Sequence, residues 1–157
     1  MDAVPVPAIR VQHDDFDTAA EIEQLTAGRT DIGTVVSFSG LCRDEAGTLA
    51  ALELEHYPGM AEAEIERIAG TALARWQLSG LTVVHRYGRI CPGERIVLVV
   101  TAAAHRRAAF EAASFLMDYL KSRAPFWKKE ERRGGDSGDW VAAKADDEEA
   151  LARWQVP

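Results

Sequence analysis

Basic side chains are concentrated in one short stretch of the sequence, LKSRAPFWKKEERR, which runs from Leu120 to Arg133. The chain as a whole is acidic, with 25 Asp and Glu against 18 Lys and Arg. This stretch nevertheless holds a third of those basic residues, and Glu130 and Glu131 are its only acidic ones. Because the chain as a whole is negative, any anionic ligand must be bound by a local basic pocket of this kind. The basic residues are Lys121, Arg123, Lys128, Lys129, Arg132 and Arg133.

Two lysines of this stretch, Lys121 and Lys128, flank the apolar segment Pro-Phe-Trp. That segment can turn the chain back and form an apolar wall beside both ammonium groups. Two ammonium groups against a wall of low dielectric constant lower each other's pKa, which makes lysine a base or a nucleophile near neutral pH. The simpler alternative is a solvated run of charge, because a lysine in the last turn of a helix is also favoured by the helix dipole. The residues alone leave both interpretations open.

A second cationic group occurs in the segment TAAAHRRAAF, where a predicted strand passes into a predicted helix near Ala104. His105, Arg106 and Arg107 therefore lie in or beside the first helical turn. Free backbone N–H groups make this end of a helix positive, so cations there cost up to about 1 kcal/mol each unless an anion binds. The arrangement favours a phosphate or carboxylate site. The alternative is a solvated helix start with His105 as its cap.

Arg43 follows a predicted strand that contains Gly40, so we expect its side chain at a strand end. We interpret the neighbouring Cys42 as a residue of the core rather than as a reactive thiolate.

The histidines and cysteines show none of the spacings of a protein metal site. The sequence contains neither a dinucleotide-binding fingerprint nor a P-loop. We therefore expect no metal and no cofactor.

Length and composition set the class of protein. The 157 residues are expected to form one domain, residues 1–157, that buries about two-thirds of its unfolded surface. A net charge of −7 argues against binding to nucleic acid or to an anionic membrane, and no apolar run approaches the roughly 20 residues of a membrane span. With two cysteines a disulfide framework is excluded, and the N-terminus lacks the pattern of a signal peptide, so the cytoplasm is the expected compartment.

The hydrophobic pattern predicts an α+β fold in which helices pack on a mainly antiparallel sheet. Alternation at 49–57 indicates a strand, and an apolar stripe with helical spacing indicates a helix at 60–78. The strands at 81–90 and 94–104 are expected to pair across a Cys-Pro-Gly corner. Strands are predicted at 8–13, 32–43, 49–57, 81–90, 94–104 and 139–144, and helices at 18–27, 60–78, 105–123 and 146–154.

Several segments occur together and in a fixed order: FSGLCR, LELEHYPGM, VVHRYGRICPGE, AHRRAAFEAASFLMDYLKSRAPFWKKE and DWV. With them the sequence, from about Ile32 to Trp154, resembles the catalytic (large) subunit of molybdopterin synthase. The resemblance implies an α+β fold of the α/β-hammerhead type. It also implies a sulfurtransferase of molybdenum cofactor biosynthesis, which converts cyclic pyranopterin monophosphate (precursor Z) to molybdopterin.

The same resemblance implies the partners. Both sulfur atoms come from the thiocarboxylated C-terminal Gly-Gly of a small ubiquitin-like subunit. Two large subunits form a central homodimer, and one small subunit binds at each end to complete a heterotetramer. Because the donor sulfur belongs to the small subunit, the chain itself needs no catalytic cysteine.

The resemblance also implies roles for individual residues. Lys121 and Lys128 match the family's two catalytic lysines, and we expect Lys121 to transfer protons or to capture the substrate covalently. Lys144 is expected to reach the neighbouring subunit's site, although arginine is common there in the family, and lysine loses the bidentate phosphate contact. Leu41 and Cys42 replace a basic residue and a valine of the family. The expected substrate-binding residues are Arg43, His105, Arg106, Lys129 and Lys144.

The sequence leaves two other functions open. A basic groove could bind an acidic peptide tail without catalysis, in which case the protein would bind the small partner but make no dithiolene. Alternatively, Cys42 could carry sulfur as a persulfide, in which case Cys42→Ala would abolish turnover.

Overall fold

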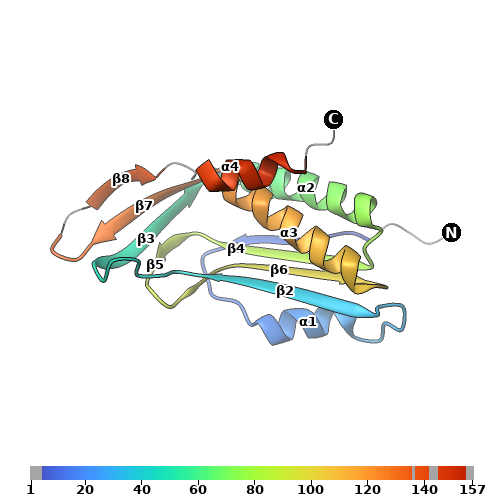
Figure 1. The fold of residues 1–157 in the computed structure, drawn as a ribbon. Coiled ribbons are helices and arrows are strands. Elements are labelled where there is room, and N and C mark those ends of the chain that lie inside the picture. Colours follow the sequence, from blue (N-terminus) through green and yellow to red (C-terminus); the bar gives the residue numbers. More distant parts are fainter. Residues whose placement is uncertain (1–4, 136, 142–144, 155–157) are drawn as a thin grey trace.

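Residues 5–135, 137–141 and 145–154 are described by a computed structural model, in which four helices pack with two four-stranded sheets (Figure 1). None of the described helices is both long and apolar enough to cross a membrane. In chain order the elements are β1 (Ala8–Gln12), α1 (Thr18–Thr26), β2 (Thr34–Leu41), β3 (Leu49–His56), α2 (Met60–Trp76), β4 (Gly80–Arg86), β5 (Gly88–Ile90), β6 (Arg95–Ala103), α3 (Arg106–Ser122), β7 (Phe126–Arg132), β8 (Ser137–Val141) and α4 (Ala145–Ala152).

The first sheet has the strand order β1-β4-β6-β2, with β1 parallel to β4 and the other pairs antiparallel. Helices cover both of its faces: α2 and α3 lie on one face and α1 lies on the other (Figure 1). Val97 and Val99 of β6 pack in the cluster formed with α2 and α3. Leu98 and Val100 pack with residues of α1 on the opposite face. The near-continuous apolar sequence of β6 follows from this burial on both faces.

The second sheet has the order β5-β3-β7-β8, and all its neighbouring strands are antiparallel. It extends beyond the helices at one end of the molecule (Figure 1). A small apolar cluster contains Leu49, Leu52 and Leu54 of β3 together with Cys42 and Ile90. The predicted α+β class with mainly antiparallel strands is confirmed, with two sheets where one was expected.

The segment predicted as one strand, 81–90, is divided between the two sheets. β4 pairs with β6 as predicted, whereas β5 pairs with β3 in the second sheet. The chain changes sheets at Gly88, whose φ is 93°. A Cβ atom there would lie 2.7 Å from Cδ2 of His13, so both the backbone conformation and the space favour glycine. The predicted pairing with 94–104 is therefore correct for the β4 part and wrong for β5.

The basic stretch forms a strand that was not predicted from the sequence. β7 lies between β3 and β8, and its sequence FWKKEER lacks the alternation of apolar and polar residues by which strands are recognised. Lys128 pairs with Leu54 of β3 on one side and with Val141 of β8 on the other. The Pro-Phe-Trp segment therefore leads into a central strand, whose hydrogen bonding to two neighbours replaces the missing apolar pattern.

Gly33 lies where the start of β2 meets the start of α3. Its N–H donates a hydrogen bond to the carbonyl oxygen of Ala103 at 3.0 Å. A Cβ atom at this position would lie 2.2 Å from the carbonyl oxygen of Ala104. Glycine therefore allows β2 to approach the chain just before the helix, and this close approach contributes to a hollow beside His105.

Replacing Gly33 by alanine should lower the free energy of unfolding by at least about 2 kcal/mol, because the new methyl group must displace backbone atoms. Urea unfolding followed by circular dichroism measures the change. Gly70→Ala is the matched control, since Gly70 lies inside α2 with open space around its Cβ position. That substitution should stabilise the protein by about 0.5–1 kcal/mol. Equal effects of the two substitutions would contradict the close approach at Gly33.

Candidate functional site

An aromatic stack connects the C-terminal end of α3 to the first sheet. Lys121 lies in the last turn of α3, and the chain then enters β7 at Phe126. The ring of Phe126 stacks on the ring of His85 in β4, with centroids 3.9 Å apart and planes inclined by 14°. His56 of β3 packs against the same Phe126 ring at 6.0 Å. The start of β7 is thereby fixed where the two sheets meet.

His85 is buried in its neutral form. Its Nδ1 atom lies 2.8 Å from the carbonyl oxygen of Arg86, which can only accept, so Nδ1 carries the hydrogen. Burial lowers the pKa of His85 to about 4, and the nearby charges of His56 and Lys121 lower it further, against the opposing effect of the hydrogen bond. Near neutral pH, the imidazole of His85 therefore carries no charge.

Lys128 is half-buried on β7, two residues beyond Phe126, so the two side chains share one face of the second sheet. Leu54 lies opposite Lys128 and belongs to the apolar cluster that contains Cys42. The charge of Lys128 lowers the pKa of the Cys42 thiol, although burial raises it by more. Lys128 is therefore close to Cys42, the residue that precedes Arg43.

The arginines and lysines of the basic stretch have different partners. Each arginine is paired with a carboxylate: Arg123 with Glu148 at 2.7 Å, Arg132 with Glu130, and Arg133 with Asp44 at 3.3 Å. In the described parts of the chain, no carboxylate oxygen lies within 4 Å of the ammonium groups of the lysines. The excess positive charge of the stretch is therefore carried by Lys121, Lys128 and Lys129.

Arg43 lies beyond the end of β2, as predicted. Its side chain is 76% exposed, and its guanidinium donates to Glu45 at 2.7 Å. In high dielectric an exposed pair of this kind is worth at most about 1 kcal/mol, so an anionic ligand can replace the carboxylate at little cost.

The second cationic group forms a separate site at the start of α3. His105 is the N-cap residue, with φ −130° and ψ 147°, and its side chain makes no capping hydrogen bond. His105 and Arg106 are exposed and line an open hollow of about 490 Å³ with Gly33, Thr34 and Ala104. Arg107, also at its edge, is paired with Glu111 at 2.9 Å. The predicted cationic helix start is confirmed.

One chain does not bring all the predicted site residues together. Arg106 and Lys121 lie in the first and last turns of the same helix, and 15 residues at a rise of 1.5 Å separate them by about 22 Å. Lys129 lies on the opposite face of β7 from Lys128, with its ammonium group 5.8 Å from the centroid of the Trp140 ring. Lys144 is outside the described residues.

The stack of His85 and Phe126 was missed by the sequence reasoning. In the sequence, His85 is one of several histidines that are scattered along the chain, and it lies in a strand rich in apolar residues. Its contact with Phe126 spans 41 residues, so no local pattern of the sequence could indicate it. The one available signal was the presence of a histidine next to the apolar residues Val83 and Val84 in this strand.

Comparison with known proteins identifies the family. The family model described as MoaE protein matches residues 11–123. A molybdopterin synthase catalytic subunit from Mesorhizobium japonicum is 69% identical over 155 residues, which cover 99% of this chain and 98% of that protein. The chain belongs to the MoaE family of molybdopterin synthase catalytic subunits. The resemblance seen in the sequence is confirmed, and the chain is a member of an enzyme family.

Solved structures agree with this assignment. A molybdopterin biosynthesis MoaE protein from Burkholderia ambifaria matches with a TM-score of 0.82 at 48% identity, covering 96% of this chain and 99% of that one. A chain in a protein–protein complex of subunits 1 and 2 of molybdopterin-converting factor from Helicobacter pylori matches with a TM-score of 0.69. It is 21% identical and covers 87% of this chain and 90% of that one, so this likeness concerns the fold alone.

Burial of His85 in its neutral form predicts a pH dependence of stability. Its pKa is about 4 in the folded protein against 6.5 for an ordinary histidine, so between these values mainly the unfolded chain binds a proton. The free energy of unfolding should therefore fall as the pH decreases from 6.5 toward 4, by roughly 2–3 kcal/mol at about pH 4.5. His85→Phe removes this contribution and retains an aromatic ring for stacking.

Urea unfolding of both proteins near pH 7.5 and near pH 4.5 measures the difference. The wild type should lose more stability than His85→Phe between the two conditions. His13→Gln, at an exposed histidine, is the control and should lose as much as the wild type. The same loss in the wild type and in His85→Phe would show that His85 is not buried in its neutral form.

Proposed function

We propose that this chain catalyses the conversion of precursor Z to molybdopterin, with Lys121 and Lys128 as its catalytic residues. The observation that carries this assignment is that the arginines of the basic stretch are paired with carboxylates, whereas its lysines have no carboxylate partner among the residues that the structure describes. A lysine ammonium without a carboxylate partner is available to bind an anion and to exchange a proton. Membership of the molybdopterin synthase family supports the reaction.

Both reactants are anionic, because precursor Z carries a phosphate and the donor ends in a thiocarboxylate. Lys128 orients the substrate and stabilises the charge that develops on it. Lys121 transfers protons or forms a transient covalent adduct while the donor sulfur attacks. The neutral ring of His85 adds no second positive charge beside Lys121. Because sulfur is transferred twice, the site holds a half-sulfurated intermediate while the spent donor is exchanged.

The sulfur donor in this proposal is a small ubiquitin-like subunit with a C-terminal Gly-Gly. Such a tail is narrow enough to enter a confined channel, and its terminal thiocarboxylate requires cations at the end. Arg43, exposed beyond β2, is available as one of them. The Helicobacter pylori structure, a complex of two subunit types that contains a chain of this fold, supports such an assembly. In the proposed assembly, a homodimer of catalytic subunits lies at the centre and one small subunit binds at each end.

A homodimer also accounts for the separation of the two cationic groups. Arg106 and Lys121 of one chain are too far apart to bind the same small substrate, but a two-fold axis can bring the α3 start of one chain to the Lys121 end of its partner. We infer that His105 and Arg106 bind the substrate phosphate in the partner's site. Lys144 is proposed to reach across in the same way.

The alternatives make different predictions. A persulfide on Cys42 is disfavoured because this residue is 2% exposed and burial raises the pKa of its thiol. A non-catalytic binding module is tested by the reaction itself. The protein, mixed with thiocarboxylated small subunit and precursor Z, should form molybdopterin, measured after oxidation as its fluorescent derivative. Binding of the small subunit without formation of product would favour the module.

Lys121→Ala should reduce the rate of molybdopterin formation by at least about 100-fold, the usual size of general acid–base catalysis. Its folding stability should hardly change, because the side chain is exposed at a helix end. Lys121→Arg keeps the charge but cannot release its proton near neutral pH, so it should be impaired as well. Arg123→Ala is the matched control: it lies at the same helix end, is neutralised by Glu148, and should retain its activity. Near-normal rates for Lys121→Ala would remove Lys121 from the mechanism.

Mixing two inactive variants tests whether the sites are shared between chains. A dimer of one Lys121→Ala chain and one Arg106→Ala chain has one intact site if Arg106 acts in the partner's site. Random exchange should then restore about a quarter of the wild-type activity, since half of the dimers are mixed and each has one working site of two. Mixing Lys121→Ala with Lys128→Ala is the control and should restore nothing, because both residues lie in one chain's site. Without recovery in the first mixture, despite demonstrated chain exchange, the shared site is wrong.

A further inference from the structure

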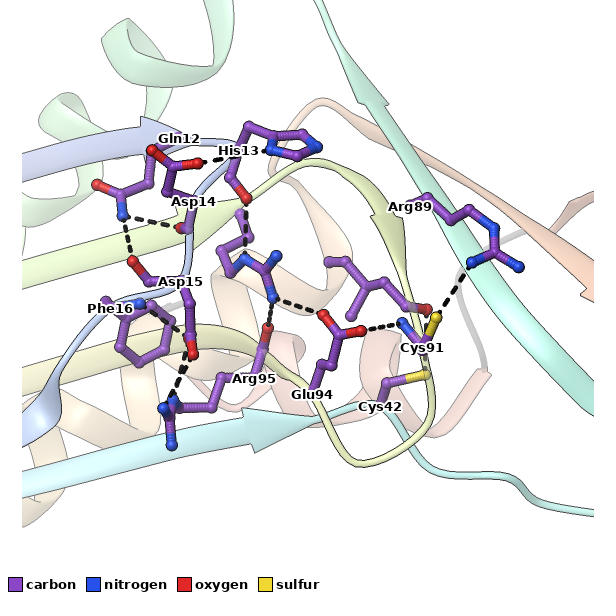
Figure 2. Close-up of polar contacts among 12 residues, drawn as sticks. Gln12, His13, Asp14, Asp15, Phe16, Cys42, Arg89, Cys91, Glu94 and Arg95 are labelled. Carbon is purple, nitrogen blue, oxygen red and sulfur yellow. Dashed lines mark hydrogen bonds and ion pairs between the residues drawn. The ribbon is translucent and has the colours of Figure 1, made fainter.

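The two cysteines of this chain, 49 positions apart in sequence, lie in segments that are hydrogen-bonded to each other. The N–H of Cys42 donates to the carbonyl oxygen of Glu94 at 2.8 Å, and the N–H of Gly93 donates to the carbonyl oxygen of Cys42 at 2.7 Å. The Sγ atom of Cys42 lies 3.7 Å from the carbonyl oxygen of Ile90, the residue before Cys91 (Figure 2). The side chain of Cys42 therefore lies against the segment from Ile90 to Glu94, which contains Cys91.

Cys91 is the accessible member of the pair. It is half-buried at the first position of the turn from Cys91 to Glu94, in which the N–H of Glu94 donates to the carbonyl oxygen of Cys91 at 3.0 Å. Nη1 of Arg89 donates to its Sγ atom at 3.2 Å (Figure 2). The guanidinium can stabilise negative charge that develops on this sulfur atom while it reacts with an oxidant. Two carboxylates lie near the Cys91–Arg89 contact. Glu94 accepts a hydrogen bond from the backbone N–H of Cys91, and Glu131 forms an ion pair with Arg89.

Cys42 is the enclosed member. It is 2% exposed and packs with Leu52, Leu54 and Ile90, so an oxidant in solution does not reach it directly. Burial raises the pKa of its thiol, and Cys91 is the nearby charge that raises it most. Because the charge of Cys91 raises the pKa of the Cys42 thiol, the two thiols are close in space. Their different exposure assigns the first reaction to Cys91.

We propose that Cys91 and Cys42 form a redox pair that a hydroperoxide converts to an intramolecular disulfide. The Cys91 thiolate attacks the outer oxygen of the peroxide, the O–O bond breaks, and the alkoxide or hydroxide that leaves takes up a proton. The Cys91 sulfenic acid is then attacked by Cys42, the S–S bond forms, and water leaves with the hydroxyl oxygen and the thiol proton. In sum, two thiols and one peroxide give one disulfide, one alcohol (water, for hydrogen peroxide) and one water.

The fold holds the turn against Cys42 before any oxidation takes place. The buried Arg86 donates from Nη1 to the Glu94 carboxylate at 3.4 Å and to the carbonyl oxygen of Arg95 at 2.8 Å. Its Nε donates to the carbonyl oxygen of His13 at 3.0 Å. Both sides of the proposed bond are thus already ordered, which favours closure of the disulfide over reaction with a second molecule. In the mechanism proposed above neither cysteine takes part in sulfur transfer, so the redox pair does not depend on that mechanism.

Reduced protein treated with hydrogen peroxide and then analysed by intact mass and peptide mapping tests the proposal. The expected product is a single polypeptide, not covalently linked to a second chain, whose mass is about 2 Da below that of the reduced protein. It should have no free thiol and should give one cross-linked peptide that joins residues 42 and 91. Its melting temperature should exceed that of the reduced protein by about 5 °C or more, because a loop of roughly 50 residues is closed. Dithiothreitol should reverse both changes.

Variants separate the two roles. Cys42→Ser should retain the reactive thiol and accumulate a sulfenic acid on Cys91 that dimedone traps, whereas Cys91→Ser should react at least about tenfold more slowly at Cys42. Arg89→Gln should slow oxidation several-fold without changing the product. Arg95→Gln, which removes an arginine that contacts Asp15 rather than either sulfur, is the matched control and should oxidise like the wild type. Two unlinked oxidised cysteines, a disulfide between chains, or thiols that persist after treatment would overturn the proposal.

Discussion

The stacking of Phe126 on His85 is the contact on which the geometry of the candidate site depends. His85 belongs to the sheet that the helices cover, and Phe126 begins β7 in the second sheet. Lys121 precedes Phe126 by five residues, and Lys128 follows it by two. Lys121 is placed by the packing of α3 on the first sheet, and the stack of the two rings places the start of β7, and with it Lys128, against the same sheet. An ionised His85 would have to be solvated, so the contact depends on the neutral form that burial imposes.

The length of α3 is a second constraint, and it determines what one chain can do alone. A straight helix of 17 residues separates its two ends by more than 20 Å. The helix start has exposed basic groups and a hollow, and the helix end has Lys121 and the aromatic stack. Neither end can approach the other by a local movement. The separation of the two groups within one chain is therefore the reason for proposing a site shared between two chains.

Local patterns predicted the parts of the fold that local forces determine. The helix predicted at 18–27 is α1, and the carboxylate of Asp17 caps it by accepting a hydrogen bond from the N–H of Ala20 at 3.1 Å. The apolar stripe of α2 likewise gave the correct buried face, because helical periodicity depends on near neighbours in sequence. β7 was missed and β5 was assigned to the wrong partner strand, because each is stabilised by pairing with β3 rather than by its own pattern. The cationic residues of the site were recognisable from the sequence, but the opposite faces of Lys128 and Lys129 follow only from the strand.

The pairing of arginines with carboxylates explains how an acidic chain can keep a confined positive site. Glu130 lies two residues from Lys128 on the same strand, yet it accepts a hydrogen bond from Nη2 of Arg132, whose Nη1 donates to the hydroxyl oxygen of Thr48. The carboxylates of the stretch therefore do not neutralise the lysines. The field of the lysines extends only about one Debye length, roughly 8 Å at physiological salt, before it is screened. The start of α3 is a second local concentration of positive charge. An anionic ligand is thus attracted near these two groups of basic residues, although the net charge of the chain is negative.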